Sequence, residues 1–225
     1  NTTVIIGHAS ISGGPSMTAD GTLDMNGFNQ QIAGLQTDTN RPAASQYIVN
    51  SSSNNDSVLT IAGPGNSIFG GIIADNVPVY GGIFKTHLTV SGGALTLTAT
   101  NTYSGTTTVS GGALYISSSG SITSSTHWAV GAGAVLAVSN NVAFSAGNIF
   151  SVAVSESSAG LLSVTGMVAL AGTLEVAGPM VSMKIIESAT GITGTFQTNN
   201  RPYVIKNGDK EVWTRGSLGT VIMVQ

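Results

Sequence analysis

The carboxylates are the side chains of this sequence that could supply acid–base chemistry. Glycoside-cleaving enzymes need two carboxyl groups, one as the acid and one as the base or nucleophile. The sequence has ten Asp and Glu residues, and they are scattered along the chain. Asp20 and Asp24 flank the start of a Gly-Thr-Leu strand, where a solvated turn and an outward strand position explain them. The acidic residues therefore predict no catalytic pair, and we expect no enzymatic activity.

Three histidines and one polar run are the candidate metal ligands. His8, His87 and His127 are dispersed, with no partner two or four positions away. The Asn-Asn-Asp run at 54–56 matches neither the EF-hand loop nor the glycine-rich calcium repeat, so we expect a turn there. The sequence has no cysteine, which excludes thiolate metal sites and thiol catalysis. We expect no metal, no cofactor and no catalytic residue.

The sequence supports neither a serine nucleophile nor a nucleic-acid partner. No Gly-x-Ser-x-Gly elbow occurs. Seven Lys and Arg residues and a net charge of −3 give no basic surface for a phosphate backbone, so we expect no nucleic-acid partner. No apolar run reaches the eighteen or so residues of a membrane helix, so we expect no membrane span.

The elements that must position these residues are short strands. Only 8% of the residues are charged, whereas 41% are hydrophobic and 30 are glycine. Ser, Thr and Asn alternate with Val, Leu, Ile and Ala, as in the stretch 95–100. This alternation has the period of a β-strand, and no window has the period of a helix. The sequence therefore predicts an all-β protein.

A repeat organises these strands. Ser-Gly-Gly-Ala-Leu at 91–95 recurs at 110–114, and looser copies occur throughout the chain. A period near twenty residues predicts a solenoid, because one coil cannot bury its apolar face alone. We predict one domain (1–225) folded as a right-handed parallel β-helix of roughly ten coils spaced about 4.8 Å apart. The inward residues should include Leu95, Leu97, Leu114 and Ile116.

The middle and the C-terminal part of the chain differ in composition and should have different structures. Repeat coils should occupy 1–178, followed by terminal coils and a hairpin-like cap over 179–225, with a turn at 206–210. The segment Thr86 to Ser155 contains no Asp, Glu, Lys or Arg. Such a surface lacks like-charge repulsion, which favours association between copies of the chain.

Residues 88–114 carry a family resemblance. They include Asn101-Thr102-Tyr103-Ser104-Gly105-Thr106-Thr107-Thr108-Val109, and the stretch 21–35 and the region after Leu162 extend the similarity. The sequence resembles the passenger domains of bacterial autotransporters that carry the passenger-associated transport repeat. It lacks their C-terminal membrane β-barrel, so the barrel is either removed or excluded, or the repeat is reused in a stand-alone secreted protein. The resemblance implies an extracellular or cell-surface rod without conserved chemistry.

Aromatic residues leave one alternative open. Asn101 and Tyr103 are expected to be structural, as a corner amide and a cover over a coil junction. Tyr80, Tyr103, Tyr115 and Trp128 would instead form a sugar-stacking strip if all were exposed. The leading expectation is a secreted or surface-displayed structural or adhesive protein that associates with itself through an uncharged lateral face or its coil ends, as a fibre or matrix subunit. The alternatives are a glycan-binding or polysaccharide-cleaving β-helix and an autotransporter passenger stalk.

Overall fold

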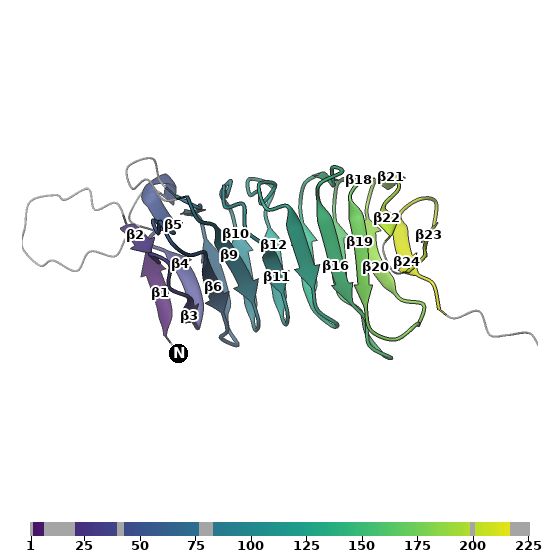
Figure 1. Cartoon of the computed structure of the whole chain (residues 1–225), viewed down its shortest axis with the longest axis horizontal. Helices are drawn as coiled ribbons and strands as arrows, with labels where there is room; N and C mark the ends of the chain where they lie inside the picture. Colours follow the sequence, from purple (N-terminus) through teal and green to yellow (C-terminus); the bar gives the residue numbers. More distant parts are fainter. Residues whose placement is uncertain (1, 7–20, 40–42, 77–82, 199–200, 217–225) are drawn as a thin grey trace, which may run out of the picture.

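The protein is an elongated rod of stacked short strands. The computed structural model describes residues 2–6, 21–39, 43–76, 83–198 and 201–216. Figure 1 shows the strands side by side along the rod, with the N-terminal strands at one end and the C-terminal strands at the other. Two sheets of eight strands run along it, and shorter three-stranded sheets form a third side. The predicted all-β parallel β-helix is confirmed.

The first long sheet consists of parallel strands contributed once per coil. In order along the rod they are β3 (Gln30–Ile32), β6 (Ser57–Ile61), β9 (Thr86–Val90), β11 (Thr107–Val109), β13 (His127–Val130), β16 (Ile149–Ala153), β19 (Thr173–Ala177) and β22 (Gln197–Thr198).

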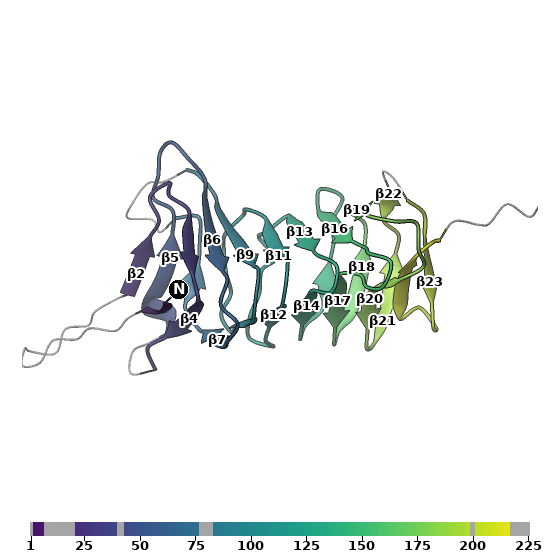
Figure 2. The same ribbon diagram turned by 90° about the horizontal axis from the view of Figure 1, so that it is seen from below.

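The second long sheet lies along a different side of the rod, as Figure 2 shows. It contains β7 (Asn66–Phe69), β10 (Ala94–Leu97), β12 (Ala113–Ile116), β14 (Val135–Val138), β17 (Leu161–Val164) and β20 (Lys184–Ser188), followed by β24 (Glu211–Thr214) and β23 (Tyr203–Lys206). The last two strands pair antiparallel and form a hairpin on the edge of β20.

The remaining strands are short. The third side contains β2 (Gly21–Asp24), β5 (Gln46–Val49), β8 (Ile72–Ile73), β15 (Val142–Ala143), β18 (Met167–Leu170) and β21 (Gly191–Gly194). Near the N-terminal end, β1 (Thr3–Ile6) pairs with β4 (Gly34–Thr37), and the only helical element among the described residues is the 3₁₀ turn Ala43–Ser45.

The strand register shows how many residues each coil uses. Leu88 pairs with Thr107, a coil of 19 residues, and the pair Leu174 and Thr198 closes a coil of 24. Between Leu59 and Leu88 the coil takes 29 residues. The expected twenty-residue coil thus holds in the middle of the rod and is wrong at the N-terminal end. Among the described residues the first long sheet has eight strands, one per coil, which is fewer than the roughly ten coils expected, because the coils toward both ends are longer than twenty residues.

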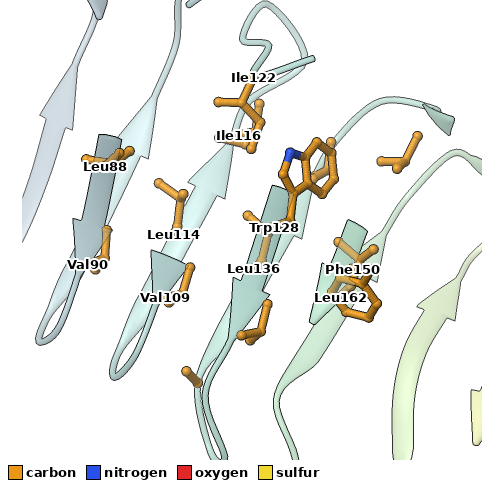
Figure 3. Packing of buried hydrophobic residues seen from close by; sticks show 14 of the residues in the cluster. Leu88, Val90, Val109, Leu114, Ile116, Ile122, Trp128, Leu136, Phe150 and Leu162 are labelled. Carbon is orange, nitrogen blue, oxygen red and sulfur yellow. The ribbon is translucent and has the colours of Figure 1, made fainter. Parts of the chain in front are cut away.

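The core is a column of aliphatic and aromatic side chains between the sheets (Figure 3). The predicted inward residues Leu95, Leu97, Leu114 and Ile116 are all buried. In parallel register Leu95 lies beside Leu114, and Leu97 lies beside Ile116, so each coil buries its apolar side chains against the next. Stacking, and not the single coil, therefore supplies the hydrophobic stabilisation.

The repeated glycine pair explains the corner between the two long sheets. Gly93 and Gly112 have φ values of 58° and 69°, a region that side chains other than glycine rarely adopt. A Cβ at Gly112 would lie 2.1 Å from the Gly93 carbonyl oxygen of the preceding coil. The corner thus needs glycine both for its φ and for the close approach of stacked backbones.

The C-terminal end carries the predicted hairpin cap. Asn207, Gly208 and Asp209 all have positive φ and turn the chain from β23 into β24. Beneath the cap the core is aromatic, with Phe196 stacked against Phe150 and edge-on to Tyr203. The turn predicted at 206–210 is confirmed.

Candidate functional site

Two buried asparagines form hydrogen bonds to the backbone of neighbouring coils. Asn101 accepts a hydrogen bond from the Ile73 amide at 2.9 Å and donates to the carbonyl oxygens of Ala99 and Ser121. Asn50 likewise accepts from Gly27 and donates to Lys85. Each amide thus satisfies backbone groups of coils before and after its own, where an unpaired group would be costly. The structural role expected for Asn101 is confirmed.

The alternative of an exposed sugar-stacking strip fails at Tyr103 and Trp128, and the structural role expected for Tyr103 agrees with its burial. Tyr103 is fully buried, and its hydroxyl lies 2.7 Å from Thr107 Oγ1. Its burial raises the pKa of the phenol well above the ordinary value. Trp128 is also buried, and its indole N–H donates to Ser125 O at 3.0 Å. Tyr115 is exposed but lies on the second long sheet, and Tyr80 falls outside the described residues.

Asp24 acts in a turn, as expected. Its carboxylate accepts hydrogen bonds from the Asn26 amide, the Ser51 amide and the Ser51 hydroxyl. Partial burial raises the pKa of Asp24, but these hydrogen bonds outweigh it and lower the pKa below the ordinary value. Asp20 and His8 lie outside the described residues.

Asp56 and His87 form a polar contact between two coils. Asp56 Oδ1 accepts from the Lys85 amide at 2.7 Å, and its Oδ2 lies 3.4 Å from His87 Nε2. His87 Nδ1 accepts from the Thr106 amide at 2.8 Å, so Nε2 carries the proton that faces Asp56. The Lys85 amide is the main cause that lowers the pKa of Asp56, with His87 adding to it. These contacts hold backbone in place, which agrees with the turn expected at 54–56.

A row of three hydrogen-bonding side chains crosses the outer surface of the first long sheet. Ser151 and Glu175 are register partners on β16 and β19, and Ser151 Oγ donates to Glu175 Oε2 at 2.9 Å. His127, on β13, places Nε2 at 2.7 Å from the same Ser151 oxygen. Because the single serine proton is directed to the carboxylate, His127 Nε2 is the donor in the second bond.

A groove with a volume of about 440 Å³ lies beside this row. It runs across β11, β13, β16 and β19, and we call it the Glu175 groove. Most of its floor is small apolar side chains and strand backbone. Its lining includes Ala129, Gly131, Ala153 and Ala177, with the hydroxyls of Thr108, Ser110 and Ser151 and the carboxylate of Glu175.

The row does not have the connectivity of a catalytic triad. In a triad the carboxylate orients the imidazole, and the imidazole takes the serine proton. Here the Ser151 proton faces the Glu175 carboxylate directly, and His127 donates to the serine oxygen, so the imidazole is not placed to take the serine proton. The arrangement fixes the position of one carboxylate.

A second polar cluster lies at the cap. Lys184 Nζ is 2.8 Å from Glu187 and 3.6 Å from Glu211, whose other oxygen accepts from the Trp213 indole at 2.9 Å. The hydrogen bond between Lys184 and Glu187 lowers the pKa of the carboxyl and raises the pKa of the ammonium group. Lys206 lies over the Trp213 ring, 4.6 Å from its centre. Lys184 contacts Glu187 on its own strand and Glu211 on β24, so the cluster secures the hairpin to β20.

Comparison of the chain with protein-family models, curated proteins and solved structures finds no match. Within the part of the chain that the structure describes, no three or more His, Cys, Asp and Glu side chains gather in a way that could hold a metal ion. No described helix is long and apolar enough to cross a membrane.

The sequence reasoning missed the row of His127, Ser151 and Glu175. Their registry depends on coils of different lengths, because Trp128 pairs with Phe150 and Phe150 pairs with Leu174. The three residues are spaced 24 positions apart, whereas the clearest sequence repeat, at 91–95 and 110–114, recurs after 19, so that repeat does not indicate their registry. The alternation around Trp128 did carry a usable signal, since Trp128 and Val130 share the inward side of β13.

Proposed function

We propose that this protein is a non-enzymatic structural rod, secreted or displayed at a bacterial surface, whose copies associate side by side. The observation that carries this proposal is the outer surface of the second long sheet. Ten outward residues on β7, β10, β12, β14 and β17 carry no charge, and we call this surface the neutral face. They are Asn66, Ile68, Ala94, Thr96, Ala113, Tyr115, Val135, Ala137, Leu161 and Ser163.

The neutral face is apolar as well as uncharged. Ile68 is 61% exposed and Tyr115 is 44% exposed, and both belong to the row that also contains Thr96 and Ala137. Apolar surface removed from water contributes about 25 cal/mol per Å². A broad sheet surface without charge therefore favours contact with an identical surface, because no desolvation of ions opposes it.

The cap supports side-by-side association over end-to-end growth of the second long sheet. An exposed strand edge is a template for another strand. Here β24 lies antiparallel on β20 and occupies the edge where a parallel coil would have to add. The resemblance of residues 88–114 to autotransporter passenger repeats supports the extracellular location.

The test places lysines on the neutral face. We expect Tyr115→Lys combined with Ala137→Lys to abolish association, because each contact would then bring like charges together in a partly desolvated interface. The matched control is Thr60→Lys combined with Thr89→Lys, two half-buried positions on the outer surface of the first long sheet. Sedimentation velocity gives the mass of each variant. Equal association of both double variants would refute the neutral face as the interface.

A further inference from the structure

The Glu175 groove combines one charge with a largely apolar floor. Glu175 is the one ionisable group that lines it, and alanine and glycine residues form much of the remaining surface. The aromatic side chains of these coils, Trp128 and Phe150, point into the core and offer no ring to a sugar. The groove therefore lacks the usual surface for a neutral sugar ring and has a place for a single cation.

The carboxylate is held in one orientation. Glu175 Oε2 accepts from Ser151, and His127 donates to the same Ser151 oxygen, so that serine cannot turn its proton elsewhere without losing a bond. His127 is thus a positioning residue for Glu175. A preorganised carboxylate loses less side-chain entropy on binding than a free one.

We propose that the Glu175 groove binds a lysine side chain presented by an extended peptide segment of another protein. The aliphatic stem lies on the methyl groups of Ala129 and Ala153, and the ammonium group meets the Glu175 carboxylate. A lysine side chain is apolar along its stem and charged at its end. The groove likewise has an apolar floor with the Glu175 carboxylate at one end. This proposal is independent of association through the neutral face, which lies on the other long sheet.

The length of the groove fits this ligand. It extends over β11 to β19, three strand intervals of about 4.8 Å, or roughly 14 Å. Glu175 lies at one end and the hydroxyls of Thr108 and Ser110 lie at the other. The hydroxyls can bond the peptide groups on either side of the lysine, while the carboxylate takes the charge.

The experiment is saturation-transfer NMR with Nα-acetyl-lysine N-methylamide, which reports weak binding to single rods and to assemblies alike. We expect saturation of the stem methylenes and weaker or no saturation with the matched norleucine compound, which lacks the ammonium group. Glu175→Gln should weaken the apparent Kd about two- to fivefold, the range of a partly exposed ion pair. Glutamine can still accept the Ser151 proton, so the fold is retained.

Two further variants make the test specific. Ala153→Leu fills the floor of the groove from an outward strand position and should remove binding. Glu156→Gln removes an exposed carboxylate outside the groove and should leave binding unchanged. Equal binding of the lysine and norleucine compounds, or an unchanged Kd in Glu175→Gln, would overturn the proposal. Tighter binding of glucosamine than of the lysine compound would assign the groove to an amino sugar instead.

Discussion

Ser163 and Glu187 are register partners on β17 and β20, and the Ser163 hydroxyl donates to Glu187 Oε1 at 2.7 Å. This contact marks the boundary between two kinds of surface. On the N-terminal side the row continues through Ala137, Tyr115 and Thr96 without a charge. On the other side lie the ion pairs of the cap. The rod thus combines a neutral side with a charged end.

Association through the neutral face should resist salt. Ionic contacts weaken as the Debye length falls from about 30 Å at 0.01 M salt to about 3 Å at 1 M. An apolar, uncharged contact does not depend on this screening. We expect the sedimenting mass to stay constant or to rise over this range. Dissociation in high salt would indicate that charged groups form the contact.

Asn101→Ala should destabilise the rod strongly. The substitution removes the side-chain acceptor of the buried Ile73 amide, and it removes one of the two hydrogen bonds that each of the Ala99 and Ser121 carbonyl oxygens accepts. We expect a loss of about 3 kcal/mol in the free energy of unfolding, measured by urea titration. Asn140→Ala is the control, because Asn140 is only half-buried and water can replace its contacts. Similar losses in both variants would contradict this role of Asn101.

Gly112→Ala tests the corner of the coil. The new Cβ would meet the Gly93 carbonyl oxygen, and alanine would have to adopt a φ of 69°. Strain at such positions costs on the order of 1–3 kcal/mol, and the clash adds to it. Gly147→Ala is the control, since no atom lies within 4 Å of its added Cβ. Thermal unfolding should show a large decrease for the first variant and a change within about 0.5 kcal/mol for the second.

The cap should loosen in acid. The pKa of Glu187 is lower in the folded protein than its ordinary value of 4.5, so its contribution is present above that value and is lost as the pH falls through the folded pKa. Because the side chain is more than a third exposed, the contribution is at most about 1 kcal/mol. The fluorescence of Trp213 should therefore change below about pH 4.5.

Two variants complete the acid test. Glu187→Gln should remove much of this fluorescence change, since glutamine does not titrate. Trp213→Phe identifies its source, because Trp128 is buried away from the cap. An identical acid transition in Glu187→Gln and the parent would show that other groups govern the cap.

The sequence predicted those features that depend on local pattern. Alternation placed Leu95 and Leu97 in the core, and the repeat at 91–95 and 110–114 predicted stacked coils. The first follows from alternation within a few residues, and the second from a repeat after 19 residues. Looser copies of the repeat along the chain extended this prediction to a whole solenoid.

The candidate groove could not be predicted in the same way. Ser151 and Glu175 are neighbours because the intervening coil has 24 residues, whereas the coil from Leu88 to Thr107 has 19. Small changes in corner length decide which polar residues lie in register, and composition does not reveal them. The alternative of an aromatic strip was already disfavoured by the sequence, because alternation places Trp128 on the inward side of its strand together with Val130.

Electron microscopy of the purified chain in negative stain tests the central claim most directly. Side-by-side contact through the neutral face predicts assemblies in which rods lie parallel along their length, with single rods in the Tyr115→Lys and Ala137→Lys double variant. Isolated short rods of the parent chain at high protein concentration would contradict the account.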